Sequence, residues 1–281
     1  MSPVRYLERA GRPRLAYRYD AAAGECRAAV LLTHGYAEHG GRYDHVVGAW
    51  CQQGIAVGRV DLRGHGLSDG ERGHVGDIAD YVDDLRDVLS VLSTDPQFAS
   101  IRRPILFGHS LGGLVSTHAA FSFRDRIAGL ALSSPFFGVA RRISFLEGGA
   151  AVVLGKLTPT MRRASGLSGA DLTHDAELAA RYEADPLHFD FVTTGWYKAI
   201  TRAQDDAQAR APELRVPVYG IAAGDDKVVK LEDTKRFFAR VGSAEKELDV
   251  RPALYHEILN EPVWPELASM FSERMLRWAR E

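Results

Sequence analysis

Apolar runs alternate with amphipathic segments along most of the chain. Between the apolar runs, helical spacing is clear in residues 77–94, and helix-like segments follow at 111–123 and from Trp264 onward. Six short runs are almost continuously apolar, as is typical of parallel strands buried on both faces. They occupy residues 28–35, 55–66, 103–110, 127–135, 216–224 and 248–256. This alternation predicts a doubly wound α/β fold, with a mostly parallel twisted sheet flanked by helices.

Residues 136–206 interrupt this alternation. The segment contains helix-like pieces separated by Pro and Gly, and it shows no clear strand. We therefore expect a helical lid inserted into one α/β core, whose two parts are residues 1–135 and 207–281. Apolar residues 143–157 are flanked by arginines. This pattern fits peripheral contact of the lid with a lipid surface and packing of the lid on the core equally well.

Composition narrows the classes of function. The chain has 281 residues and a formal net charge of -2, with no basic block that would indicate a nucleic-acid partner. Its 2 cysteines imply no disulfide framework. We find neither the apolar core of a signal peptide nor an apolar run of about 18 residues that could span a membrane. These features predict a cytoplasmic protein.

The strongest catalytic signal is LFGHSLGG, residues 106–113. Gly108, Ser110 and Gly112 form a G-x-S-x-G motif between a predicted strand and a predicted helix, which is the context of a nucleophile elbow. Glycine on both sides removes Cβ atoms that would collide in the strained turn. The helix N-terminus directs backbone amides toward developing negative charge. We therefore predict Ser110 as the nucleophile.

A serine nucleophile needs a base, and the base needs a carboxylate that orients it. In this fold the three residues follow the order Ser, Asp or Glu, His. His256 is the only histidine after the predicted strand 216–224 and is the predicted base. That strand ends at two adjacent carboxylates, Asp225 and Asp226, and either is chemically suitable as the acid. We interpret Glu257, beside the base, as a solvated side chain.

An acyl-transfer site also needs two N–H donors for the oxyanion. One is expected from the backbone of Leu111, directly after the nucleophile. The other is expected from the loop that follows the first predicted parallel strand, residues 33–43, where the Tyr36 N–H is the candidate. His34 and Gly35 are interpreted as residues that shape this loop.

Two other polar clusters favour a structural interpretation. Early histidines lie at spacings that match no metal-ligand pattern, so no metal is expected. They are His34, His39, His45 and His65. The glycine-rich segment 61–70, DLRGHGLSDG, lacks the spacing of a phosphate or dinucleotide loop. We expect it to be a tight loop pinned by contacts of Asp61 and Arg63.

These residues give the chain a resemblance to the monoacylglycerol lipase and lysophospholipase group of α/β-hydrolases. The matching segments follow the family order over nearly the whole chain: HGYAEHGGRY, DLRGHGLSDG, GHSLGG, YEADPLHF, AAGDDKVV and LYHEILNE. The resemblance implies a catalytic triad of Ser110, Asp226 and His256. It also implies an oxyanion hole formed by the amides of Tyr36 and Leu111.

The resemblance extends to the alcohol side of the pocket. Glu38 and Arg42 match positions that border the glycerol-binding end in this family, and are the implied substrate-binding residues. Two positions depart from the pattern. Ala37 stands where the family usually has a second glycine, and Leu259 stands where some members carry a second histidine. Monoglyceride preference therefore has less support than serine hydrolysis.

We expect a serine carboxylester hydrolase that cleaves monoacylglycerol- or lysophospholipid-like single-chain acyl esters through an acyl-enzyme, without a cofactor. The substrate is then a small-molecule ester or lipid. A prolyl-aminopeptidase-type serine peptidase is an alternative, because it shares the elbow and a helical lid. A non-catalytic binding protein on the same scaffold is a second alternative. Activity on amino-acyl amides would favour the former, and failure to react with any activity probe would favour the latter.

Overall fold

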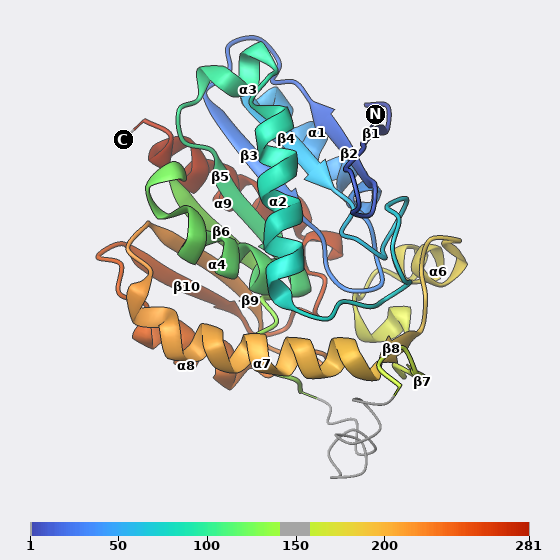
Figure 1. The fold of residues 1–281 in the computed structure, drawn as a ribbon. Coiled ribbons are helices and arrows are strands. Elements are labelled where there is room, and N and C mark those ends of the chain that lie inside the picture. Colours follow the sequence, from blue (N-terminus) through green and yellow to red (C-terminus); the bar gives the residue numbers. More distant parts are fainter. Residues whose placement is uncertain (1, 141–157, 281) are drawn as a thin grey trace.

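The computed structural model describes residues 2–140 and 158–280, and its centre is an eight-stranded sheet (Figure 1). The strand order is β1-β2-β4-β3-β5-β6-β9-β10. The strands are β1 (Arg5–Leu7), β2 (Leu15–Asp20), β3 (Ala28–Thr33), β4 (Ile55–Val60), β5 (Ile105–His109), β6 (Gly129–Ser133), β9 (Val218–Ala223) and β10 (Lys246–Arg251). The six strands from β4 to β10 in this order are parallel, so the predicted doubly wound α/β fold is confirmed.

The sequence pattern missed the antiparallel edge of the sheet. β1 pairs with β2, and β2 pairs with β4, both antiparallel. At the other edge, β10 lies at 246–251 and is partly exposed, so the expectation of a doubly buried strand at 248–256 was wrong. β10 is the last strand of the sheet, and none of its residues is fully buried. His256 consequently lies in the loop after β10 and not at the end of the strand.

Helices cover both faces of the sheet. Figure 1 shows α2 and α4 in front of the sheet and α1 and α9 behind it. The helices are α1 (Asp44–Gln52), α2 (Ile78–Leu92), α3 (Pro96–Ser100), α4 (Leu111–Phe123), α6 (Ala176–Ala184), α7 (Thr194–Arg210), α8 (Leu231–Arg240) and α9 (Trp264–Trp278). Short 3-10 helices are η1 (Gly40–Tyr43), η2 (Arg124–Arg126), η4 (Gly169–Asp171), η5 (Ala211–Glu213) and η6 (Ile258–Asn260). Two buried apolar clusters, one on each face, form the core.

The inserted region contains a short antiparallel pair, β7 (Arg162–Ala164) and β8 (Phe191–Thr193). The expectation that this region has no strand was therefore wrong. Each strand has only 3 residues, too few to show a period of two. The apolar segment 143–157, with its two interpretations, lies outside the described residues. The predicted lid boundary at residue 206 falls inside α7, and the division into core and lid stays a prediction.

The parallel register places the loops that carry the candidate site residues at the carboxyl ends of the strands. Thr33 at the end of β3 pairs with Gly108 of β5, and His109 pairs with Ser133 at the end of β6. The carboxyl ends of parallel strands are where ligands bind in open α/β sheets. The loops that carry Tyr36, Ser110 and Asp226 follow the carboxyl ends of β3, β5 and β9.

Candidate active site

Ser110 occupies the sharp turn between β5 and α4. Its backbone angles are φ 50 and ψ -118, a region that residues other than glycine rarely adopt. A Cβ on Gly108 would lie 2.2 Å from the carbonyl oxygen of Gly112, and a Cβ on Gly112 would lie 2.1 Å from that of Thr33. Neither position has room for a Cβ, as predicted: at residue 108 it would collide with Gly112, and at residue 112 it would collide with the end of β3.

Backbone hydrogen bonds hold this strained turn in place. The Ser110 N–H donates to the carbonyl of Ser133 at 2.9 Å, and the Ser110 carbonyl accepts from the Phe136 N–H at 3.0 Å. Both partners belong to the neighbouring strand β6 or to the loop that follows it. A strained conformation persists only when its surroundings determine it, and the contacts to β3 and β6 provide that constraint.

His256 and Asp226 form a buried pair beside Ser110. The His256 Nδ1 lies 2.7 Å from Asp226 Oδ2 and, facing a carboxylate, acts as the donor. Asp226 Oδ1 accepts from the N–H groups of Val228 and Val229, both at 2.8 Å. Asp225 is exposed, and its N–H donates to the carbonyl of Leu254. Asp226, and not Asp225, is thus the carboxylate that faces the histidine.

The electrostatics of this pair favour a charged acid and a basic ring. Burial acts to raise the pKa of Asp226, but the His256 charge and the hydrogen bonds to the carboxylate outweigh it and hold the pKa below its ordinary value. Burial acts to lower the pKa of His256, but the Asp226 carboxylate outweighs it and raises that pKa above 6.5. The imidazole is therefore a stronger base than a free histidine.

Ser110 and His256 both line one cavity, with a volume of about 980 Å³ including its open mouth. Within the described chain, no hydrogen bond joins the Ser110 hydroxyl to the histidine ring. Such bonds often tighten only in the substrate complex. The cavity therefore brings the candidate nucleophile and the candidate base to one surface.

The two candidate oxyanion donors are the backbone N–H groups of Leu111, which follows the serine, and of Tyr36. Leu111 is the first residue of α4, so its N–H has no acceptor within the helix. Tyr36 lines the cavity, and no hydrogen bond in the described part of the chain uses its backbone N–H or that of Leu111. The neighbouring Ala37 has φ 62, a left-handed conformation that glycine adopts more easily. This geometry gives a physical reason for glycine at that position in the resembling family.

His34 fixes the loop that carries Tyr36, as expected for a structural residue. Its Nδ1 lies 2.7 Å from the Gly35 carbonyl, and its Nε2 accepts from the Leu62 N–H at 2.9 Å. The side chain is fully buried. The ring therefore ties this loop to the start of the glycine-rich loop at 61–70.

The Tyr36 side chain connects the same loop to the inserted region. Its hydroxyl lies 2.8 Å from the carbonyl oxygen of Gly73 and 3.1 Å from that of Phe191 in β8. The ring centroid is 3.9 Å from that of Trp196 in α7. Contacts of one residue thus join the candidate oxyanion loop to β8 and α7.

Glu38, Arg42 and Glu257 form a buried ion network at one end of the cavity. Arg42 binds both oxygens of Glu257, at 2.6 and 2.8 Å, and one oxygen of Glu38 at 3.1 Å. Glu38 also accepts from the Tyr43 hydroxyl at 2.7 Å. Glu38 and Glu257 line the cavity, whereas Arg42 is absent from the residues that line it. The guanidinium therefore holds the two carboxylates in position from behind.

The expectation that Glu257 is solvated was wrong. Its side chain is only 6% exposed, and Arg42 is the reason that this burial is tolerated. Burial acts to raise the pKa of Glu257, but Arg42 outweighs it and lowers the pKa to about 2. Arg42 stands 215 positions away in the sequence, so no local pattern could have revealed the pair.

His109 is a further polar residue at the cavity that the sequence reasoning did not single out. Its ring centroid is 4.9 Å from that of His256, and its Nδ1 lies 3.1 Å from the Ser133 hydroxyl. Burial, together with the charge of the neighbouring ring, lowers the pKa of His109 to about 4. His109 is therefore neutral near pH 7, and His256 stays the candidate base.

The opposite wall of the cavity is mainly apolar and comes largely from the inserted region. Its members share an apolar side chain and a position over Ser110: Phe136, Val139, Leu172, Val192, Trp196 and Ile200. Trp196, Ile200 and Gln204 follow one face of α7 at a spacing of four. That spacing is the signal from which these residues could have been predicted.

The glycine-rich loop is pinned by Asp61 and Arg63 as expected, and these two residues have different partners. Asp61 accepts from the N–H groups of Gly40 at 2.9 Å and Leu67 at 3.0 Å. Arg63 binds both oxygens of Asp84, at 2.6 and 2.7 Å. The loop is thus fixed by protein contacts.

Among the described residues, no three or more His, Cys, Asp and Glu side chains gather in a group that could hold a metal ion. No helix in residues 2–140 or 158–280 combines the length and the apolar character needed to cross a membrane.

The strand order and the turn that carries Ser110 define an α/β-hydrolase. The family described as serine aminopeptidase, S33 (Hydrolase_4) matches residues 24–263, and the chain belongs to this family.

Within this family, the chain is similar to lipid hydrolases. It is 32% identical over 253 residues to a monoacylglycerol lipase of Mycolicibacterium smegmatis, covering 90% of this chain and 89% of the relative. It is 31% identical over 239 residues to the phospholipase YtpA of Bacillus subtilis, covering 84% and 90%. The crystal structure of Paleococcus ferrophilus monoacylglycerol lipase superposes with a TM-score of 0.83 and 26% identity, covering 93% of this chain and 99% of that one. The chain is thus monoacylglycerol lipase-like.

Proposed function

We propose that the protein is a serine hydrolase that cleaves carboxylic esters of single-chain acyl lipids. The observation that carries this proposal is one cavity with Ser110 and the Asp226-bound His256 on one wall and an apolar surface on the other. The lipid substrates named for the monoacylglycerol lipase and phospholipase relatives support it. The reaction requires only groups that this chain supplies.

In the proposed first step, the Ser110 hydroxyl oxygen attacks the ester carbonyl carbon while His256 Nε2 takes the hydroxyl proton. The carbonyl oxygen becomes an oxyanion and accepts hydrogen bonds from the Tyr36 and Leu111 N–H groups. The bond to the alcohol oxygen then breaks, and His256 returns the proton to the departing alcohol. The products are the free alcohol and an acyl-enzyme on Ser110.

The second step repeats this chemistry with water. His256 takes a proton from water as the oxygen attacks the acyl carbon, and the bond to Ser110 breaks when the proton returns to the serine oxygen. The fatty acid is released and Ser110 is regenerated. Throughout, Asp226 stays ionised and stabilises the imidazolium that forms twice in each cycle.

The two ends of the cavity indicate how a substrate would be oriented. The apolar wall beneath α7 suits an acyl chain, which gains from burial at about 0.8 kcal/mol per methylene. The other end presents Glu38 and Glu257 against a single guanidinium, Arg42. Two carboxylates against one cation favour an uncharged polyol or a cationic headgroup over an alcohol that ends in phosphate. A monoacylglycerol fits both ends.

The peptidase alternative remains in this proposal because the family description names an aminopeptidase. An aminopeptidase needs a carboxylate for the substrate ammonium group. Glu38 and Glu257 are the carboxylates at the cavity, and both are already held by Arg42. Because neither carboxylate is free to bind an ammonium group, esters are favoured over amino-acyl amides as substrates. A binding protein without catalysis is disfavoured, because it would gain nothing from the strained backbone at Ser110.

The test is activity-based labelling combined with a substrate panel. Wild-type protein is expected to react with a fluorophosphonate probe and to hydrolyse monooleoylglycerol faster than lysophosphatidic acid. Ser110→Ala should abolish both reactions, whereas Ser165→Ala, a change at another serine of the same cavity, should retain them. Labelling of Ser110→Ala at another serine would overturn the proposal. Turnover of prolyl p-nitroanilide without ester turnover would establish the peptidase instead.

A further inference from the structure

A second cavity opens at the end of the sheet opposite to Ser110. It lies where β5 and β6 begin, between the second half of α2, the segment 102–104 and residues 123–127, and has a volume of about 780 Å³ including its mouth. The parallel strands run from this cavity toward the candidate active site. β5 alone spans roughly 16 Å, so the two cavities are distinct.

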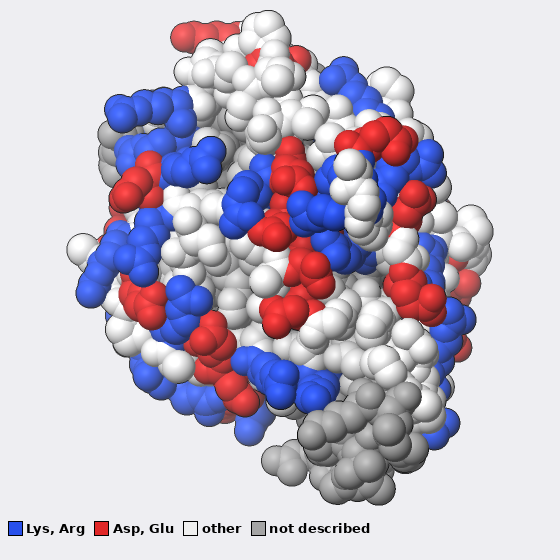
Figure 2. Space-filling model, in the orientation of Figure 1, with Lys and Arg blue, Asp and Glu red and all other residues white. Residues whose placement is uncertain are grey.

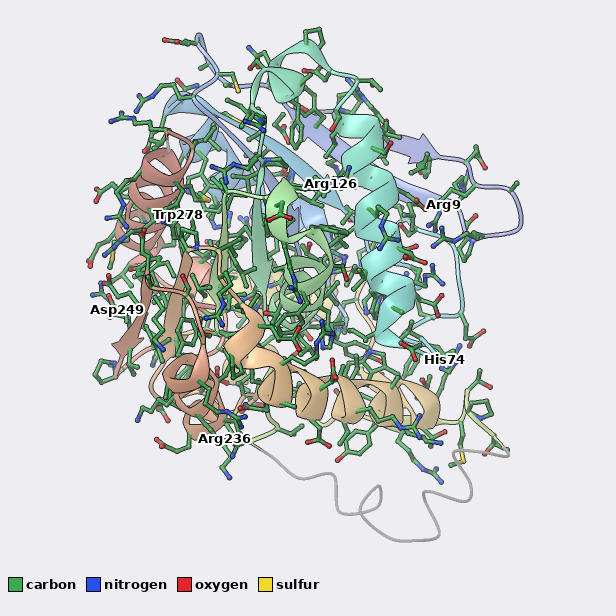
Figure 3. The ribbon with its side chains drawn as sticks, turned by 60° about the vertical axis from the view of Figure 1, so that its left-hand side comes forward. Arg9, His74, Arg126, Arg236, Asp249 and Trp278 are labelled. Atoms are coloured by element: carbon green, nitrogen blue, oxygen red, sulfur yellow. The ribbon has the colours of Figure 1, made fainter. Side chains whose placement is uncertain are left out.

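Arginine dominates the walls of this second cavity. Arg86, Arg102, Arg103 and Arg126 line it, and Asp125 is the single carboxylate among the lining residues. Figure 3 places Arg126 beside α2, and Figure 2 shows blue side chains around the hollow next to that helix. A concave surface with one sign of charge concentrates the electrostatic potential and attracts ions of the opposite sign.

Among residues 2–140 and 158–280, three of these arginine side chains have no partner. The guanidinium groups of Arg102, Arg103 and Arg126 make no hydrogen bond and no ion pair there. Arg86 pairs with Asp83, which does not line the cavity. In contrast, Arg42, Arg59 and Arg63, whose side chains are at most 12% exposed, are bound by carboxylates.

The floor of the cavity is apolar. Phe123 and Ile127 are 4% and 1% exposed and lie beneath the arginines, together with Pro104. The Arg86 guanidinium carbon lies 5.5 Å from the centre of the Phe123 ring. An apolar floor reduces the local dielectric constant and therefore strengthens the attraction between a bound anion and the guanidinium groups.

We propose that this cavity binds a phosphate-bearing anion. Guanidinium groups present planar pairs of N–H donors that match phosphate oxygens, and several of them can bind one group together. The ligand would supply the negative charge that the protein does not provide for Arg102, Arg103 and Arg126. The competing interpretation is that these arginines only balance the negative C-terminal ends of α2 and α4.

The experiment measures binding of inorganic pyrophosphate by isothermal titration calorimetry at low ionic strength. Wild-type protein is expected to bind one equivalent. The Arg102→Gln/Arg126→Gln double variant should bind about 100-fold more weakly, because each guanidinium that is removed takes away a charge-assisted hydrogen bond that accounts for about tenfold in affinity. Arg124→Gln is the matched control, because Arg124 lies in the same 3-10 helix but pairs with Glu213 outside the cavity. It should bind like wild type.

A parallel sedimentation experiment identifies the source of the phosphate group. Retention on phosphatidylglycerol vesicles that pyrophosphate displaces would indicate a lipid headgroup, and pyrophosphate binding without retention would indicate a free phosphate ligand. Thermal unfolding of every variant and turnover of a p-nitrophenyl ester confirm that the fold and Ser110 are intact. Absence of saturable pyrophosphate binding by wild-type protein would overturn the proposal. Equal weakening in Arg124→Gln would overturn it too, because the effect would then be one of overall charge.

Discussion

The elbow and the inserted region face each other across one cavity, but different kinds of contact hold them. At the elbow, backbone contacts the backbone: Gly112 approaches the Thr33 carbonyl, and the Ser110 N–H donates to the Ser133 carbonyl. Side chains make many of the contacts of the inserted region with the core, such as the ring of Trp196 on Tyr36, in addition to backbone bonds such as that from the Glu257 N–H to the Leu172 carbonyl. Backbone contacts depend little on side-chain identity apart from glycine. The backbone geometry at Ser110 is therefore constrained more tightly than the shape of the apolar pocket.

The largest effect is expected from the acid that holds the base. Asp226→Asn should lower kcat by about 10⁴, because the amide no longer favours the required histidine tautomer or stabilises the imidazolium. Asp225→Asn is the matched control and should change kcat by less than about threefold, as expected for an exposed residue. Steady-state kinetics on a p-nitrophenyl ester measure both. Equal losses in the two variants would break the assignment.

The pH profile tests the same pair without removing it. The base must be neutral, and Asp226 raises the pKa of His256 above 6.5. The value of kcat/KM should therefore rise with pH and level off above a midpoint higher than 6.5, falling about tenfold per pH unit below it. A midpoint at or below 6.5 would contradict the structure. The residual activity of Asp226→Asn should show a lower midpoint than that of wild type.

A methyl group at the elbow tests the backbone contacts directly. Gly112→Ala should lower the free energy of unfolding by about 1–3 kcal/mol, because the new Cβ collides with the end of β3. Gly48→Ala, in α1, meets no atom within 4 Å and should instead stabilise by about 0.5–1 kcal/mol. Urea denaturation measures both changes. A neutral Gly112→Ala would mean that the elbow relaxes easily and would remove the contrast with the inserted region.

The smallest effect is expected on the apolar wall. Ile200→Ala should reduce kcat/KM about tenfold for long-chain esters, because the shorter side chain no longer packs on the acyl chain, and leave acetate esters nearly unchanged. Arg202→Ala, an exposed change on the same helix, is the control and should alter neither. A chain-length series of p-nitrophenyl esters measures the ratio. An equal loss on acetate would show that α7 also positions the reacting groups.

The contrast between local backbone geometry and long-range side-chain contacts also explains which features could be predicted from the sequence. G-x-S-x-G encodes a local backbone geometry, and apolar runs encode buried strands, so Ser110 and the parallel sheet could be placed from local patterns. The choice between Asp225 and Asp226 could not be made from the residues alone. It depends on the turn in which Asp226 Oδ1 accepts two N–H groups from Val228 and Val229. The resemblance supplied that choice.

Features that depend on distant partners were missed or wrong. Glu257 was expected to be solvated because its partner Arg42 lies in another part of the chain. β7 and β8 pair only with each other, and neither has enough residues to show a period of two. Long-range pairing of this kind leaves no signal in a single sequence.

Tyr36 connects the inserted region with a proposed oxyanion donor. Its ring and hydroxyl contact Trp196 and β8, while its own amide is the proposed second donor to the oxyanion. A displacement of the inserted region that carries those partners would pull on the same residue. Under the proposed mechanism, an occupied acyl pocket therefore steadies the amide, and a long acyl chain gains in turnover as well as in affinity. Short soluble esters would be slow substrates even at saturation.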